Sequence, residues 1–404
     1  MCAPSICGRP LSWSRGTGEQ REATRTGPRW QGSRPFGSCC SRSGGRTGED
    51  EGGSGLKRQV EPLHIVAIGG GTGLSALLRG LKEYTPHAGG DLGQAPARMP
   101  EIDITAVVTV TDDGGSSGRL RRELDILPPG DIRSCMVALS EDEGLLSRLF
   151  QHRFDTGRSL KGHSFGNLFL SAMTQLTGDF AKAVALSSEV LATRGRIFPS
   201  TAANVSLEGW LEDGTGVAGE TKISRSRVRI QRVALKPRRV KPLAETLEAI
   251  RRADLICLGP GSLYTSVIPN LLVEGIPEAM VEAKAPLVYF ANLMWQPGET
   301  MNYKASDHVR AIERHARKGL VNFVGVNTRP ITGAMRRRYA AERVFPVEND
   351  TPMLREMGVK VIGRNLLDEG EKVRHNSAAI AEVAVHLAAQ ARRQARQRAR
   401  VAGQ

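Results

Sequence analysis

The sequence predicts an α/β fold built on a Rossmann-like, mostly parallel, doubly wound sheet. Short apolar runs alternate along the chain with segments whose leucines recur at helical spacing. Several of the apolar runs end in polar, glycine-rich turns, which is typical of the carboxyl edge of such a sheet. The chain has 404 residues, of which 40% are hydrophobic, so it can bury a large core. We expect residues 60–388 to form one nucleotide-binding domain.

The two ends of the chain differ from this domain in composition. Residues 1–59 are rich in Gly, Ser and Arg without periodicity, and we expect a disordered extension. Residues 389–404 form a basic tail. The net charge of +14 is concentrated at these ends, because residues 1–59 carry ten basic and five acidic side chains and the tail carries five arginines and no acid. The body is only weakly basic, which disfavours nucleic acid as a partner.

The cellular location is predicted from what the chain lacks. No apolar run is long enough for a signal peptide or a membrane span. Only Cys135 and Cys257 lie in the body, and no CxxC spacing occurs. The sequence therefore favours a cytoplasmic protein.

The first element is a strand at residues 65–68, followed by a glycine-rich turn and a helix that begins near Leu74. Glycines let backbone N–H groups approach a phosphate at a helix N-terminus. We therefore expect the turn to hold a diphosphate through Gly70, Gly71, Thr72 and Gly73. The turn fits neither the dinucleotide fingerprint nor the P-loop, so a plain tight connection is the alternative.

A second strand leads into a second turn, TDDGGSSG. Asp112 and Asp113 stand at the strand's carboxyl end, where they are suited to Mg²⁺, a ribose or an attacking hydroxyl. Ser116, Ser117 and Arg119 follow as candidate partners of a phosphate. The alternative is a solvated turn in which Asp113 caps the next helix.

The middle of the chain adds one polar turn and one insertion. A helix is expected from Gly130, opened by Asp131. His163 and Asn167 lie in a glycine-bounded turn before another helix and are candidate ligand contacts, although a structural histidine and a helix cap are the alternatives. Residues 202–235 alternate in polarity and predict a β-hairpin insertion.

A third glycine turn follows the strand expected at residues 254–258. Gly261 and Ser262 offer donors to phosphate, and Tyr264 offers a ring that can stack on a base or sugar. Further strands are expected at 287–291 and 323–326. Four strand ends thus deliver polar loops, and we expect them to share a cleft at the carboxyl edge of the sheet.

Five long motifs occur in order: TDDGGSSGRLRREL, GHSFGNLFLSAM, GPGSLYTSVIPNLL, NLMWQPGET and KVRHNSAAIAEVA. With them, residues 63–388 closely resemble the YvcK-type gluconeogenesis factors of the CofD-like superfamily. The resemblance implies a cytoplasmic regulator that binds a UDP-sugar such as UDP-N-acetylglucosamine, with roles in growth on gluconeogenic carbon sources and in cell shape. It also implies ligand contacts by Tyr264 and Arg374.

The related CofD transferases suggest an alternative function. They imply Mg²⁺-dependent transfer of a phospholactyl-type group from a nucleoside diphosphate donor to an alcohol, with Asp113 at the catalytic position and Asp112 assisting the metal. The long DDGGSSGRLR loop and the GHSFGN and QPGET motifs favour a non-enzymatic regulator instead. The sequence does not decide whether the protein catalyses a reaction, whether it forms a homo-oligomer, or which proteins it binds.

Overall fold

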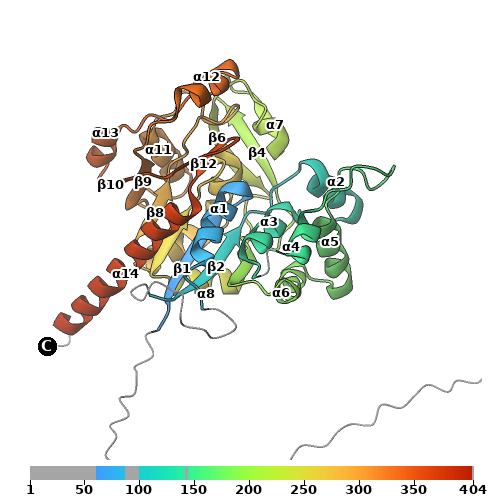
Figure 1. The fold of residues 1–404 in the computed structure, drawn as a ribbon, viewed down its shortest axis with the longest axis horizontal. Coiled ribbons are helices and arrows are strands. Elements are labelled where there is room, and N and C mark those ends of the chain that lie inside the picture. Colours follow the sequence, from blue (N-terminus) through green and yellow to red (C-terminus); the bar gives the residue numbers. More distant parts are fainter. Residues whose placement is uncertain (1–60, 87–99, 142–143, 403–404) are drawn as a thin grey trace, which may run out of the picture. The chain divides into compact units, whose positions relative to one another are not determined.

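The computed structural model describes residues 61–86, 100–141 and 144–402. Its centre is a seven-stranded parallel sheet in the order β10-β9-β8-β7-β1-β2-β3 (Figure 1). These strands are β1 (Leu63–Gly69), β2 (Ile102–Val108), β3 (Arg196–Pro199), β7 (Leu255–Leu258), β8 (Leu287–Phe290), β9 (Phe323–Asn327) and β10 (Lys360–Arg364). The predicted Rossmann-like α/β class is confirmed.

The helices flank the sheet and connect its strands. They are α1 (Gly71–Lys82), α2 (Gly115–Leu124), α3 (Gly130–Leu139), α4 (Leu145–Gln151), α5 (Phe165–Thr177), α6 (Phe180–Val190), α7 (Glu220–Ile223), α8 (Ala244–Arg251), the π-helical turn η1 (Leu263–Val267), α9 (Ile268–Leu271), α10 (Ile276–Glu282), α11 (Ala305–His315), α12 (Gly333–Ala341), α13 (Thr351–Glu356) and α14 (Ser377–Ala402). Helix α1 packs between α3 and α14 on the face nearer the viewer in Figure 1.

The order of the strands places a crevice beside β1. The chain first builds outward through β2 and β3, and then returns to place β7 on the other side of β1, where Ile65 pairs with Leu255. Such a reversal opens a crevice at the carboxyl ends of the two strands, which is where doubly wound sheets bind ligands. The loops that follow β1 and β7 stand at this switch point.

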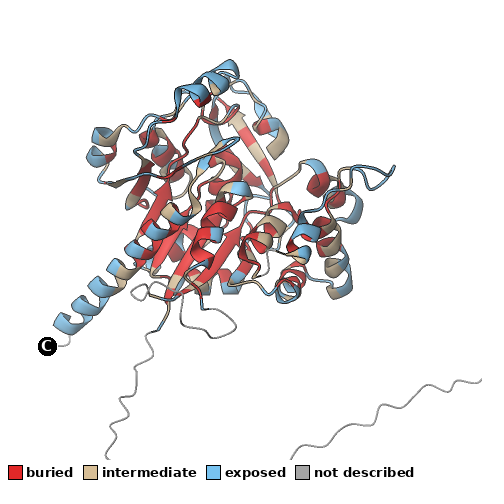
Figure 2. Ribbon diagram, in the orientation of Figure 1, coloured by how far each residue is buried: buried red, intermediate tan, exposed pale blue. Residues whose placement is uncertain are grey.

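The core consists of the strands and the helix faces packed on them, as the red segments of Figure 2 show. Strands β7 and β8 are buried along their whole length, as expected for a parallel sheet covered on both faces. The outer strands β3 and β10 were not predicted. Each is a short run with charged or half-buried positions, RIFP and KVIGR, so neither carries a clear apolar signal.

The insertion predicted at residues 202–235 is antiparallel, as expected, but contains more than a hairpin. It is a three-stranded sheet of β4 (Ser206–Leu211), β5 (Gly216–Ala218) and β6 (Ile230–Lys236). Residues 221–223, expected in a strand, belong to helix α7 (Glu220–Ile223), which begins after Gly219 takes a φ of +97°. A second small sheet pairs β11 (Leu367–Glu369) with β12 (Val373–His375).

Helix α14 runs through the segment that was predicted as a basic tail, so within residues 389–402 that segment continues a helix. In the described ranges, every helix is too short or too polar to span a bilayer. The predicted extension at residues 1–59 lies outside the described residues.

Candidate functional site

The turn between β1 and α1 presents a helix N-terminus at the switch point. Gly70 is the N-cap residue of α1, and as a glycine it has no side chain with which to accept from the first N–H groups of the helix. Gly71 has a φ of +63°, which favours glycine. The first turn of a helix carries partial positive charge, so this end of α1 is suited to an anion.

This turn packs directly on the loop that follows β7. A Cβ on Gly73 would overlap the carbonyl oxygen of Pro260, and it would also crowd Gly261. Only glycine at position 73 therefore lets the two loops lie this close. The first and third of the predicted glycine loops are the pair that meets at the switch point.

Between and above these loops lies a pocket of about 660 Å³. Seven of the predicted ligand residues line it, namely Gly70, Gly71, Thr72, Gly73, Gly261, Ser262 and Arg374. Arg79 on α1 adds a second cation, and Trp295 and Gln296 from the loop after β8 form another part of the wall. The pocket thus combines backbone donors with two arginines.

Gln296 and Glu299 of the QPGET motif form hydrogen bonds with the loop after β7. Gln296 donates through Nε2 to Ser262 Oγ at 2.9 Å, while its Oε1 accepts from the Leu263 N–H at 3.3 Å. Glu299 accepts from the Tyr264 N–H at 2.9 Å and from Thr265 Oγ1 at 3.0 Å. Burial raises the pKa of Glu299 above its usual range, although these hydrogen bonds oppose the shift. The motif holds the phosphate-suited loop in place.

Tyr264 does not line the pocket. Its side chain is fully buried, and its hydroxyl lies 2.8 Å from the Tyr303 hydroxyl and 3.3 Å from the carbonyl oxygen of Ile230. The π-helical turn η1 aims the ring into the core, where burial raises the pKa of Tyr264. In this conformation the ring supports the loop from below, and its predicted contact with a ligand stays a prediction.

The second glycine turn forms a separate polar cluster that does not line this pocket. Ser116 Oγ lies 3.0 Å from His163 Nδ1, and Asn167 Nδ2 donates to Ser117 Oγ at 3.4 Å. Arg119 donates to the Lys161 carbonyl oxygen at 2.8 Å. Burial, followed by the nearby Arg119, lowers the pKa of His163. The structure therefore brings these five predicted residues together outside the lining of the pocket. The second turn still lies next to the first, because a Cβ on Gly130 would meet Ser117 Oγ and Asp112, while the neighbouring Asp131 lies against Gly70.

The cap predicted for the helix after His163 is present. Ser164 is the N-cap residue of α5, and its Oγ accepts from the Asn167 N–H at 3.3 Å. This cap accounts for part of the GHSFGN motif without a ligand.

The two adjacent aspartates of this turn are engaged by the protein itself. Asp112 Oδ1 accepts from the Gly114 N–H at 2.8 Å. Asp113 Oδ1 accepts from the N–H and the hydroxyl of Thr221, at 2.9 and 2.6 Å. The alternative, in which Asp113 caps the following helix, is wrong, because Gly114 is the N-cap of α2 and the Asp113 carboxylate instead holds the start of α7.

Four carboxyl groups that were not predicted as site residues line the pocket, namely Asp131, Glu220, Glu342 and Asp368. Asp131 and Glu220 are the two with raised pKa values. Asp131, on α3, lies beneath the first glycine turn, where a Cβ on Gly70 would overlap its carboxyl oxygen. Burial and Asp112 raise the pKa of Asp131 to about 7, although the Gly71 N–H and Arg133 oppose the shift. Glu220, on α7, has its pKa raised to about 9 by burial and then by Asp131 and Asp112. Both shifts favour the protonated form of these carboxyl groups.

The sequence held only a partial signal for these two residues. Asp131 opens a helix that was expected there, but no local pattern shows that this helix points at the first glycine turn. Glu220 lies in an insertion whose chain path was predicted as strand.

The prediction that Asp112 helps to bind Mg²⁺ gains no support from the donor set. Within the ranges that the structure describes, no three side chains of Asp, Glu, His or Cys converge closely enough to hold an ion. The residues present do not form a complete metal site, so no step is derived through a metal.

Comparison with known proteins gives a consistent result. Residues 65–367 match the family described as 2-phospho-L-lactate transferase CofD. A gluconeogenesis factor of Halalkalibacterium halodurans is 49% identical over 324 residues, which cover 80% of this chain and 96% of that protein. The gluconeogenesis factor of Bacillus subtilis is 48% identical, covering 80% of this chain and 97% of that protein. A crystal structure of a Bacillus halodurans protein, 48% identical, matches with a TM-score of 0.75 over 80% of this chain and 100% of that chain.

Proposed function

Since this chain belongs to the CofD family, and within it to the gluconeogenesis factors, we propose that it is a regulatory protein that binds a UDP-sugar such as UDP-N-acetylglucosamine. We further propose that it acts in the cytoplasm and supports growth on gluconeogenic carbon sources and the maintenance of cell shape. The main observation that supports a UDP-sugar as the ligand is the pocket at the switch point, where two glycine loops and two arginines converge.

The pocket suits a nucleoside diphosphate for two reasons. First, its volume of about 660 Å³ falls within the range of small-molecule sites. Second, a diphosphate over Gly70–Gly73 would accept from the N–H groups at the start of α1, with Gly261 and Ser262 as further donors. Arg79 and Arg374 line the same pocket and supply the positive charge that a diphosphate needs.

The carboxyl of Asp131 makes the site sensitive to proton concentration. An ionised carboxylate beneath the glycine turn would repel a diphosphate, whereas a protonated carboxyl donates a hydrogen bond to it. Because its pKa is about 7, Asp131 changes between these two states in the physiological range. We therefore propose that the ligand binds the form in which Asp131 is protonated.

The geometry favours a binding protein over the alternative transferase. The carboxylate that a transferase would use, Asp113, already accepts two hydrogen bonds from Thr221 and does not line the pocket. A transfer reaction through Asp113 stays a prediction that the variant described below addresses.

The proposal is tested by calorimetric titration of the full chain with UDP-N-acetylglucosamine at about pH 6.5, with and without Mg²⁺. Arg374→Ala should weaken binding by about tenfold or more, because a charge-assisted hydrogen bond contributes about 1.5–3 kcal/mol. Lys372→Ala is the matched control, since this exposed cation precedes the same strand β12 and does not line the pocket.

Two results would overturn the proposal. One is the absence of binding by any UDP-sugar at millimolar concentration. The other is an equal loss of affinity in the Arg374→Ala and Lys372→Ala variants, which would place the ligand elsewhere or show that only the overall charge matters.

A further inference from the structure

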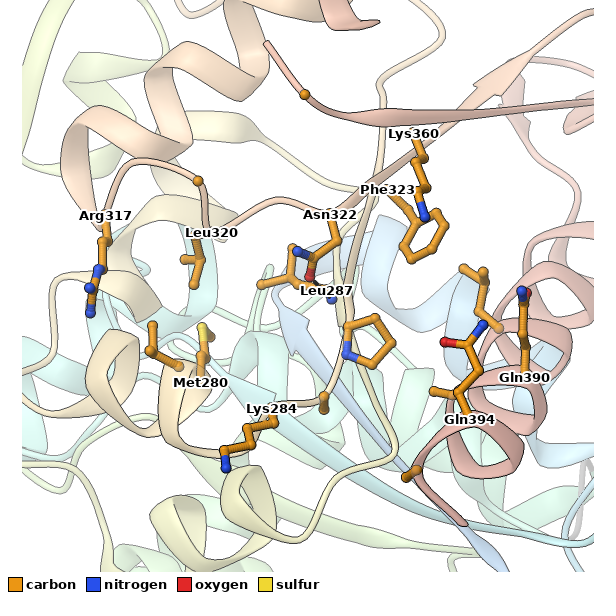
Figure 3. A pocket seen from close by; sticks show the side chains of 18 of the residues that line it. Met280, Lys284, Leu287, Arg317, Leu320, Asn322, Phe323, Lys360, Gln390 and Gln394 are labelled. Carbon is orange, nitrogen blue, oxygen red and sulfur yellow. Dashed lines mark hydrogen bonds between the residues drawn. The ribbon is translucent and has the colours of Figure 1, made fainter. Parts of the chain in front are cut away.

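A second, larger pocket lies at the opposite edge of the sheet. It has a volume of about 880 Å³ and is bounded by the end of α10, the amino ends of β8, β9 and β10, the turn after α11, and α14 (Figure 3). The strands contribute their first residues, Leu287, Phe323 and Lys360. We call this pocket the amino-edge groove. It shares no residue with the pocket between the glycine loops after β1 and β7, which we call the glycine-loop pocket.

The charge of the groove has one sign. Its lining includes the cations Lys284, Arg317, Lys318, Lys360 and Arg398, and no acidic residue. Within the described part of the chain, none of these five takes part in an ion pair. Unpaired cations around a concave surface attract a partner of opposite charge.

The groove also has apolar and amide surface between its cations. Figure 3 shows Met280, Leu287 and Leu320, which are buried, among the basic side chains, with Gln390 and Gln394 projecting from α14 on the other side. The accessible apolar surface comes from Val281 and from the half-buried Ala285, Pro286 and Phe323. Val281 at the rim is 41% exposed. Apolar surface flanked by charge is typical of a groove that receives an amphipathic helix.

Helix α14 carries this surface beyond the body of the domain. Arg392 anchors the helix, because its Nε donates to Asp254 Oδ1 at 2.8 Å and its Nη1 donates to the Glu61 carbonyl oxygen at 2.6 Å. After this anchor, residues 393–402 are largely exposed, as the pale blue end of α14 shows in Figure 2. We call residues 393–402 the arm.

The arm is both basic and unsupported. Arg393, Arg396 and Arg400 lie on it in addition to Arg398 of the groove. A helical stretch of this length is marginal in water without packing, so a partner that lies along it would stabilise it. The cationic surface therefore extends past the end of the groove.

We propose that the amino-edge groove and the arm bind an acidic amphipathic helix of a partner protein. The apolar face of such a helix would cover the floor of the groove, and its carboxylates would pair with the surrounding cations. A second copy of this chain is disfavoured, because it would bring the same cationic surface to the groove. Single-stranded nucleic acid is disfavoured as well, since the aromatic ring in the lining, Phe323, faces Lys360, whose Nζ lies 5.7 Å from the ring centroid.

The probe is a fluorescein-labelled helical peptide of about 15 residues, with leucines at i, i+3, i+4 and i+7 and glutamates on both flanks. Fluorescence anisotropy with the full chain should show saturable binding that weakens as salt is added. Lys284→Glu/Lys318→Glu should weaken binding by about tenfold or more, and removal of residues 394–404 should also weaken it. Arg158→Glu/Arg337→Glu is the matched control, since it reverses two exposed cations outside the lining of the groove.

Hydrogen exchange locates the peptide independently of charge, and protection should increase in α10 and in residues 387–398. The proposal is overturned if the peptide does not bind, if the control variant loses as much affinity as the groove variant, or if a peptide with lysine in place of glutamate binds equally well. It is also overturned if the groove variant instead abolishes binding of an RNA oligonucleotide or dissociates a dimer in sedimentation. UDP-sugar affinity should be unchanged in the groove variant, so failure here is distinct from failure of the proposed function.

Discussion

The glycine turns after β1 and β2 resemble each other in sequence and differ in what they do. Each leads from a buried strand into a helix whose N-cap is glycine, Gly70 for α1 and Gly114 for α2. The turn after β1 opens onto a pocket and packs against the loop after β7. The turn after β2 directs its polar groups to its own neighbours, including His163 and Asn167.

The difference shows that a sequence suited to bind an anion does not by itself make a site. What distinguishes the two turns is their place in the sheet, because only the turn after β1 stands where the strand order reverses. A carboxyl group of the chain meets an N–H group in both turns, Asp131 at Gly71 and Asp112 at Gly114, so this contact does not distinguish them.

The largest expected effect comes from disrupting the contact between the loops. Gly73→Ala would push the turn away from Pro260, at a cost of about 1–3 kcal/mol in stability. Ligand affinity should fall on the order of a hundredfold, because donors from both loops would be displaced. Chemical denaturation and calorimetric titration measure the two quantities.

Gly115→Ala is the comparator in the other turn. Gly115 has a φ of +46°, and no atom lies within 4 Å of the position that a Cβ would take, so alanine there costs about 1–2 kcal/mol of backbone strain without a clash. Affinity for the UDP-sugar should be unchanged. If the Gly115 variant loses as much affinity as the Gly73 variant, then the two turns serve one site and the distinction between them is wrong.

A smaller effect is expected from the carboxyl beneath the first turn. If the ligand requires protonated Asp131, affinity at about pH 8 should be about tenfold lower than at about pH 6, since the pKa is about 7. Asp131→Asn should remove this pH dependence. The affinity of the variant at about pH 8 should equal the affinity of the native chain at about pH 6. An unchanged pH dependence in the variant would assign it to another group, such as Glu220.

The same group affects stability with a defined sign. Asp131 holds its proton more tightly in the folded state, with a pKa of about 7, than in the unfolded chain, where the ordinary value is 3.8. The native state therefore binds more protons between these values, and the free energy of unfolding falls as pH rises from about 4 to about 7. Denaturation at several pH values should show a shallower slope for Asp131→Asn.

The smallest effect on binding is expected at the second turn. Asp113→Asn should lower the free energy of unfolding by about 1–2 kcal/mol, because it weakens the hydrogen bonds that hold the start of α7. UDP-sugar affinity should change less than about twofold. The native chain and the variant should also be incubated with nucleoside diphosphate donors and a deazaflavin alcohol. If the native chain turns these substrates over and Asp113→Asn does not, Asp113 is a catalytic residue and this prediction is wrong.

The sequence was sufficient for the fold class because the strands that form the centre of the sheet carry continuous apolar runs. Val66 and Ile256 lie in such runs, each followed by a glycine turn that marks the strand's carboxyl end. These local signals also placed the phosphate-suited loops. They were weaker at the edges of the sheet, where β3 and β10 mix charged and apolar residues.

The sequence was insufficient wherever partners come from distant parts of the chain. No local pattern shows that the loop after β1 meets the loop after β7, since Ile65 and its partner Leu255 are 190 positions apart. The Tyr264 ring was expected to stack on a base or sugar, yet the π-helical turn buries it. Asp131 is adjacent to the first turn only in space, so its raised pKa depends on packing that sequence spacing does not encode.

The place of β1 in the sheet has a consequence for how the protein is made. Strands β1 and β2 leave the ribosome first and are able to pair early, whereas β7 starts only at Leu255. Until then the unpaired edge of β1 is an apolar strand open to pairing with other chains. The glycine-loop pocket cannot exist before β7 docks, so a nascent or truncated chain that ends before Leu255 has no ligand pocket and is prone to aggregate.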